Sequence, residues 1–126
     1  MIPKDKYDLD AIAMLVMASD DYILENSFDL LGWLQDCNWP VFKGVINRLS
    51  PLGDLLQEDI DSILDGDDCI LKANIVGHLI PSFENNHQKL YEKRLRELLK
   101  NPSDEELQEG LIDYIEILLV RIEKNT

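Results

Sequence analysis

The fold is decided by two stretches of the chain that resemble each other when they are aligned thirty positions apart. They are residues 34–51, LQDCNWPVFKGVINRLSP, and residues 64–81, LDGDDCILKANIVGHLIP. The alignment pairs Pro51 with Pro81 and apolar residues with apolar residues: Leu34 with Leu64, Val41 with Leu71, Val45 with Ile75, Ile46 with Val76 and Leu49 with Leu79. A further shift of about 36 brings Leu107, Leu111, Ile112 and Ile115 under Leu71, Ile75, Val76 and Leu79. Self-similarity of this period is typical of helical repeats.

Apolar residues recur at spacings of three and four along the whole chain, whereas no useful stretch alternates with the period of two expected of a strand. The sequence therefore predicts an all-α protein. Caps, prolines and glycines divide it into about seven helices: one capped by Asp8 or Asp10, then about 23–35, 38–49, 56–64, one from Asp67 or Asp68 to about residue 80, 85–100, and one that starts at 102–106. We expect the first helix to bury Leu9, Ile12, Ala13 and Val16, and the last to bury Leu107, Leu111 and Ile115.

Each repeated unit reads as a helix, an acidic turn and a second helix, which matches a HEAT-like helical hairpin. We therefore expect one domain over residues 1–126, a short α-solenoid of three hairpins plus one helix. Chance matching between amphipathic helices would give part of the same signal. The paired Pro51 and Pro81 favour the repeat.

The composition is strongly acidic, with 12 Lys and Arg against 25 Asp and Glu and a net charge of −13. Such a charge repels nucleic acid and predicts a basic protein partner. The charge is uneven: −11 over residues 1–70, +3 over residues 71–100 and −5 over residues 101–126. The opening residues lack a signal peptide's apolar core and no apolar run approaches the roughly 20 residues of a membrane span, so we expect a cytoplasmic protein with reduced cysteines.

Turns of a solenoid project from one edge, which suggests where the negative charge gathers. Asp36, Asp65, Asp67 and Asp68 would form an acidic ridge that Asp104, Glu105 and Glu106 continue. Complementary charge accelerates association with a basic protein, although the same residues also suit a merely solvated surface. Trp33 and Trp39 have two readings, core packing or a binding groove. We favour the core for the pair, with Trp39 the better binding candidate because it lies beside polar residues.

The sequence carries no sign of catalysis or of a cofactor. Cys37, Cys69, His78 and His87 lack the close spacing of a zinc site. The acidic turn at 65–68 lacks the ligand spacing and the twelfth-position Glu of an EF-hand calcium loop. The six glycines are scattered and form no phosphate-binding loop. We therefore predict that the protein is not an enzyme and holds no metal or cofactor.

The central motif at 33–41, WLQDCNWPV, resembles a bacterial family known only as domain of unknown function 5071. The similarity extends to PKDKYDL at 3–9, Asp67-Asp68 at a turn and Pro102-Ser103 before acidic residues. Similar members often carry aromatics after the acidic turn, whereas residues 70–74 here have none. The resemblance implies a short HEAT-type repeat and no established activity.

Two functional hypotheses follow. The first is a cytoplasmic immunity or inhibitor protein whose acidic surface blocks a basic toxin such as a nuclease. The alternative is a general adaptor that binds a peptide or helix of a bacterial regulatory protein, in which Trp39 matters more than charge. The sequence does not decide the oligomeric state.

Overall fold

The computed structural model describes residues 2–125, and within them the chain forms ten α-helices and no strand. The helices are α1 (Leu9–Met17), α2 (Asp20–Glu25), α3 (Ser27–Gly32), α4 (Phe42–Leu49), α5 (Gln57–Leu64), α6 (Cys69–Asn74), α7 (Asn85–Lys89), α8 (Glu92–Leu99), α9 (Asp104–Gln108) and α10 (Leu111–Lys124). Two 3₁₀ helices, η1 (Ser50–Leu52) and η3 (Ile80–Ser82), and one π-helix, η2 (Ile75–Leu79), complete the secondary structure. The all-α prediction is confirmed.

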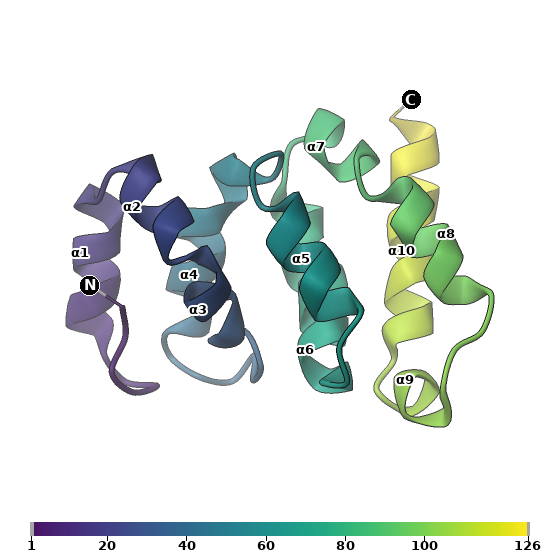
Figure 1. Ribbon diagram of the computed structural model, residues 1–126, viewed down its shortest axis with the longest axis horizontal. Helices are drawn as coiled ribbons and strands as arrows, with labels where there is room; N and C mark the ends of the chain where they lie inside the picture. Colours follow the sequence, from purple (N-terminus) through teal and green to yellow (C-terminus); the bar gives the residue numbers. More distant parts are fainter. Residues whose placement is uncertain (1, 126) are drawn as a thin grey trace.

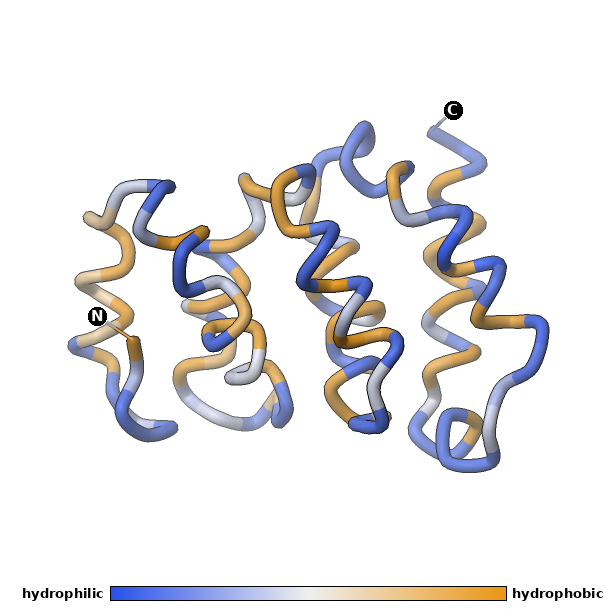
Figure 2. Tube along the Cα trace, viewed as in Figure 1, coloured by the Kyte–Doolittle hydropathy of each residue, from blue (hydrophilic) through white to orange (hydrophobic). Residues whose placement is uncertain are grey.

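The helices stand side by side in a row with two layers (Figure 1). The nearer layer in that view contains α2, α3, α5 and α8, and the layer behind it contains α1, α4, α6 and α10. In the rear layer, α1 contacts α4, α4 contacts η2, and η2 contacts α10. Figure 2 shows apolar positions recurring along the helices of both layers and mainly hydrophilic positions at the turns of the lower edge. The core is therefore a slab between the two layers.

The aligned stretches occupy equivalent places in this slab. All ten apolar side chains that the thirty-residue shift superposes are buried. Pro51 and Pro81 each lie in the first turn of a 3₁₀ helix, where a missing N–H leaves no hydrogen bond unmade. The hydroxyls of Ser50 and Ser82, beside the two prolines, hydrogen-bond each other at 2.6 Å. Sequence similarity thus corresponds to spatial adjacency.

Three of the seven expected helices are each divided in two, and one begins later than predicted. The 23–35 helix breaks at Asn26, the 85–100 helix at Leu90 and Tyr91, and the last one at Gly110, whose φ of 79° is left-handed. The helix expected from Asn38 begins only at Phe42. Asn38 is not a cap, because Val41 occupies the cap position of α4; the Asn38 N–H instead donates to the Asp36 carboxylate at 2.8 Å and holds a turn.

The expected buried faces are partly wrong. In α1 the buried residues are Ala11 and Leu15; Leu9, Ala13 and Val16 are exposed and Ile12 is half-buried. In the last expected helix Leu107 is exposed, because it lies on α9, which Gly110 separates from α10. Leu111 and Ile115 are buried, as predicted.

Two residues of α4, the half-buried Arg48 and Gly44, tie it to α1. The Arg48 guanidinium donates to the carbonyl oxygens of Leu15 at 2.9 Å and Ala18 at 3.0 Å, so α4 caps the end of α1. Gly44 faces α1 at such close range that a Cβ atom there would stand 2.3 Å from Ile12 Cγ2. The first helix is thus fixed to its neighbour by one cap and one close contact.

No helix between residues 2 and 125 is long and apolar enough to cross a membrane.

Candidate protein-binding surface

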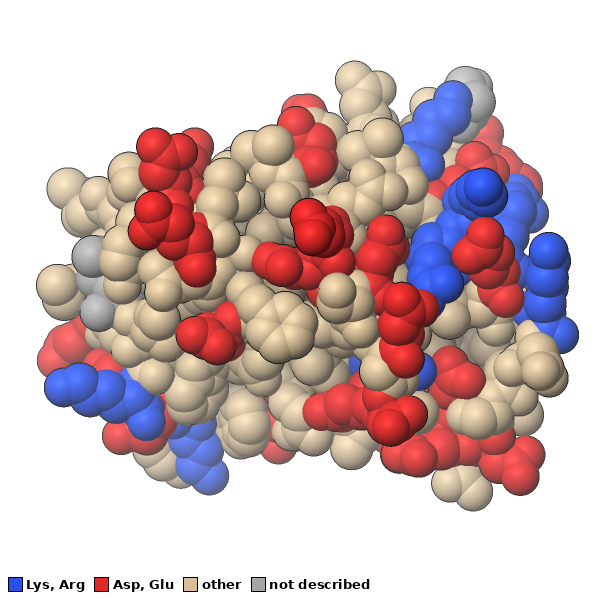
Figure 3. Space-filling model, viewed as in Figure 1, with Lys and Arg blue, Asp and Glu red and all other residues tan. Residues whose placement is uncertain are grey.

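The turns that carry the predicted acidic residues lie along one edge of the row, the lower edge in Figure 1. They connect α3 to α4, α5 to α6, and α8 to α10 through α9. We call their six predicted carboxylates, which are Asp36, Asp65, Asp67, Asp68, Asp104 and Glu105, the acidic edge. Figure 3 shows acidic side chains along this edge and over the nearer layer, while basic side chains gather around α8 and, in a second group, at the lower left near α1.

The middle turn combines helix capping with free charge. The Asp68 carboxylate accepts a hydrogen bond from the Leu71 N–H at 3.0 Å and so caps α6. Asp67, beside it, is exposed. Asp65 forms an ion pair with Arg94 of α8, whose guanidinium also lies 3.4 Å from Glu97. Asp67 therefore provides the free negative charge of this turn, while Asp68 is engaged in a cap and Asp65 in an ion pair.

Asp61 lies on α5, one turn before Asp65. Burial raises the pKa of its carboxyl, and the nearby Arg94 charge partly offsets this effect. Arg94 thus acts on three carboxylates, those of Asp61, Asp65 and Glu97, and it is the basic residue that an ion pair brings to the middle turn.

The last turn is built on a capping box. Ser103 caps α9 by accepting the Glu106 N–H, and the Glu106 carboxylate accepts the Ser103 N–H at 2.9 Å. These bonds, the backbone N–H first, lower the pKa of Glu106. Asp104 and Glu105 are left exposed in the first turn of the helix. The ridge therefore continues through Asp104 and Glu105, as predicted, but Glu106 is directed inward.

Glu106 faces a buried lysine. The ammonium group of Lys72 on α6 lies 3.6 Å from the Glu106 carboxylate, and both side chains are largely buried, with exposures of 8% and 12%. This pair connects α6 to α9. The prediction that Glu106 belongs to an exposed ridge is wrong, because its carboxylate is already used by Ser103 and Lys72.

The first turn holds the two tryptophans. Their ring centroids lie 5.7 Å apart in an edge-to-face arrangement, and both side chains are half-buried. Trp33 packs against the core. Because both side chains are only half-buried, the pair is neither fully in the core, as we favoured, nor part of an open groove. Trp39 covers Trp33 at the acidic edge while part of its own ring remains accessible.

A buried asparagine fixes this turn to the rest of the edge. The Asn74 side-chain amide donates to the carbonyl oxygens of Leu34 at 2.8 Å and Gln35 at 3.0 Å, beyond the end of α3. Asn74 and Lys72 both lie on α6, whose own N-terminus is the middle turn. One helix therefore connects all three acidic turns through buried polar contacts.

Sequence reasoning missed Asn74 and Lys72. A polar residue inside an amphipathic helix is usually assigned to the solvated face, and these two occupy buried positions because each has a partner from a distant segment. The available signal was weak: in the stretch 70–74 the only polar side chains are Lys72 and Asn74, between apolar residues.

Cysteine and histidine chemistry is not concentrated anywhere in the part of the chain that the structure describes. Cys37 is exposed and Cys69 is buried, and burial raises the pKa of the Cys69 thiol. Among residues 2–125 no three His, Cys, Asp or Glu side chains stand where they could hold a metal ion together.

Comparison with known proteins gives a family match over most of the chain. Residues 1–118 match a family described as Domain of unknown function (DUF5071). No curated protein matches the chain.

Proposed function

Because the chain belongs to the DUF5071 family, whose description carries no activity, we propose from its geometry that it is a non-catalytic domain that binds a basic protein. The observation that supports the proposal is the acidic edge, where six carboxylates project from three turns that Asn74 and Lys72 hold in fixed relation. Preorganised charge of one sign raises the association rate with an oppositely charged partner and costs little ordering on binding.

We further propose that the fold is a HEAT-like α-solenoid of three hairpins plus one helix. The thirty-residue repeat, the buried equivalents in both copies and the hydrogen-bonded Ser50 and Ser82 support this interpretation. In such a stack each unit contacts its neighbours alone, so the turns of successive units come to one edge.

The role we favour is that of a cytoplasmic immunity or inhibitor protein of bacteria. Its acidic edge would block a basic toxin, such as a nuclease, with carboxylates in the positions that nucleic-acid phosphates take. Small size and an excess of 13 negative charges support this role. Co-expression with the product of the neighbouring gene, scored for rescue of growth, tests it in cells.

Charge reversal at the acidic edge should weaken binding. The variant is Asp67→Lys, Asp104→Lys and Glu105→Lys, which spares Asp65 and Asp68 because they make an ion pair and a cap. Three exposed ion pairs at about 0.5 kcal/mol each predict a loss of at least roughly tenfold in affinity. The basic partner is first captured from cells of the native organism and identified by mass spectrometry, and its affinity is then measured at low and high salt.

A matched control separates the edge from the general field of an acidic protein. Asp21→Lys, Glu25→Lys and Asp29→Lys make the same change in net charge at exposed residues of α2 and α3. This control should keep near wild-type affinity at moderate salt. Equal losses in both variants would show that only net charge matters, and an unchanged affinity in the edge variant would refute the proposal.

The second candidate function is an adaptor for a peptide or helix of a regulatory protein, and the half-buried tryptophan pair favours it. Under this alternative Trp39→Ala should reduce binding by roughly 2 kcal/mol or more, the range of an aromatic hot spot. Binding should then depend little on salt. Isothermal titration of the captured partner decides the matter, since the acidic-edge proposal predicts strong salt dependence and a small effect of Trp39→Ala.

A further inference from the structure

The outward side of α1 is apolar and uncovered. Leu9, Val16 and Met17 are 57%, 69% and 86% exposed, and Ala13 and Met14 are exposed between them. At 100° per residue these five positions occupy one continuous arc, with Asp10 as its one charged member. The opposite side of α1 holds the buried Ala11 and Leu15. The helix is therefore packed on one side and apolar on both.

At the other end of the row, the exposed side of α8 is polar, although α10 behind it exposes Ile117 and Val120. The exposed arc of α8 carries Lys93, Arg96 and Glu97, and Lys100 follows as its C-cap. End units of helical arrays are ordinarily polar on their outer face, because that face meets water. The outer side of α8 follows this rule and that of α1 does not. Contiguous exposed apolar surface rimmed by polar residues is typical of an interaction site.

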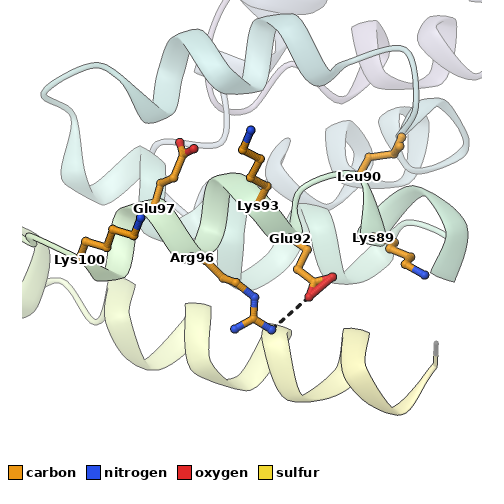
Figure 4. Close-up of a pocket in the computed structure, with 7 residues that line it drawn as sticks. All are labelled: Lys89, Leu90, Glu92, Lys93, Arg96, Glu97 and Lys100. Carbon is orange, nitrogen blue, oxygen red and sulfur yellow. Dashed lines mark hydrogen bonds and ion pairs between the residues drawn. The ribbon is translucent and has the colours of Figure 1, made fainter.

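The α8 end holds an open pocket of about 540 Å³ (Figure 4). Its lining residues are Lys89, Leu90, Glu92, Lys93, Arg96, Glu97 and Lys100. Leu90 is 44% exposed, and the methylene stems of the lysines add apolar surface beneath their charged ends. The pocket therefore offers an apolar floor with a basic rim.

Much of this positive charge is unpaired. Arg96 is held by Glu92 at 3.1 Å and by Glu123 of α10 at 3.0 Å. Among residues 2–125, Lys89, Lys93 and Lys100 take part in none of the ion pairs. All three side chains are exposed around the pocket. An occupant with an apolar surface and acidic flanks would match both the floor and the rim.

The α1 end of this same chain is such an occupant. Its apolar arc is flanked by Asp10 on the helix and by exposed Asp21 in α2, while the neighbouring Asp20 is paired with Arg48 at 2.8 Å. We propose that two copies associate head to tail, with the α1 arc of one copy seated in the α8 pocket of the next. The contact is heterologous, so both partners keep one free end and the row can continue.

The proposal is independent of the acidic edge, since it uses none of its residues. Copies that each carry a net charge of −13 repel one another at long range, so the association is weak and grows with concentration. Salt near 0.15 M screens this repulsion beyond about 8 Å while pairs in contact are screened less. Physiological salt is therefore the condition in which the contact is measured.

Two end-blocked variants test the proposal by sedimentation. Met14→Ser with Met17→Ser removes apolar area from the α1 arc without adding charge, and Lys93→Glu with Lys100→Glu reverses charge at the α8 pocket. All four side chains are exposed, and circular dichroism checks that both variants remain folded. The wild-type protein should exceed its monomer mass of 14.5 kDa as its concentration rises from about 10 µM to about 1 mM, the range of weak contacts.

The mixture of the two variants gives the decisive result. Each variant alone should stay at 14.5 kDa, whereas an equimolar mixture should form a species of twice that mass and nothing larger, because one intact end of each kind is present. A wild-type protein that stays monomeric, or a mixture that stays monomeric, would overturn the proposal. Dimers of the lysine variant alone would overturn it too, since they would require contact between two α1 arcs.

Discussion

Replacing Asn74 with alanine should lower the free energy of unfolding by about 3 kcal/mol. The substitution removes two hydrogen bonds, to the carbonyl oxygens of Leu34 and Gln35, and leaves a buried acceptor without a donor at a cost of about 1–3 kcal/mol. Asn74 is 8% exposed, so water cannot replace the lost amide without entering the core, and a small cavity adds to the loss.

Urea denaturation, monitored by tryptophan fluorescence, measures this effect. Trp33 directly precedes Leu34 and Gln35, whose carbonyl oxygens Asn74 binds, and it packs against Trp39. The control is Asn47→Ala on the exposed side of α4, which should change stability by no more than about 0.5 kcal/mol. Equal, small effects in the two variants would show that the Asn74 contacts do not hold the turn.

Replacing Lys72 with methionine should lower the free energy of unfolding by about 2 kcal/mol. Methionine keeps the aliphatic volume but leaves the Glu106 carboxylate without its partner in a largely buried site. The loss is at the low end for a broken buried pair, because Glu106 retains its bonds with Ser103. Thermal unfolding should show it, and the double variant with Glu106→Gln should be less destabilised than the sum of the single changes.

The same pair gives the stability a defined dependence on pH. The pKa of Glu106 is lowered in the folded protein, chiefly by the Ser103 N–H and less by Lys72, so its contribution is present above the ordinary pKa of 4.5. This contribution disappears as the pH falls from 4.5 through the lower folded pKa. Glu106→Gln should therefore flatten the loss of stability below pH 4.5. An unchanged acid profile in this variant would contradict the assignment.

Helix limits could be predicted where a local cap or a glycine sets them. Asp8 caps α1, Asp68 caps α6 and α5 ends just before Gly66, all within the predicted choices. The break between α7 and α8 has a distant cause: the Leu90 carbonyl accepts the Gln57 side chain of α5, and the Tyr91 hydroxyl donates to the Gly53 carbonyl oxygen. No periodicity near residue 90 encodes these contacts.

The candidate site was predictable to the level of its turns. The repeat spacing predicted that the acidic turns lie along one edge, because equivalent turns of successive helical hairpins come to the same edge of the stack. It did not predict how the carboxylates divide between free charge, capping and pairing, since that depends on residues such as Arg94 and Lys72 from other helices. The prediction of the buried side of α1 was wrong because nearly every residue of that helix is apolar. The spacing of apolar residues therefore does not indicate which side faces the core.

The π-helix at 75–79 has a consequence for how this family can vary in length. Its hydrogen bonds span five residues rather than four, so it accommodates one more residue than an α-helix over the same span. Loss of a single residue there would restore regular α-helix over the same span, so the residues beyond it would keep their orientation relative to α6. Ser82 would then still reach Ser50. A deletion of one residue should therefore be tolerated better within residues 75–79 than within α6, where it would rotate everything beyond it by 100°.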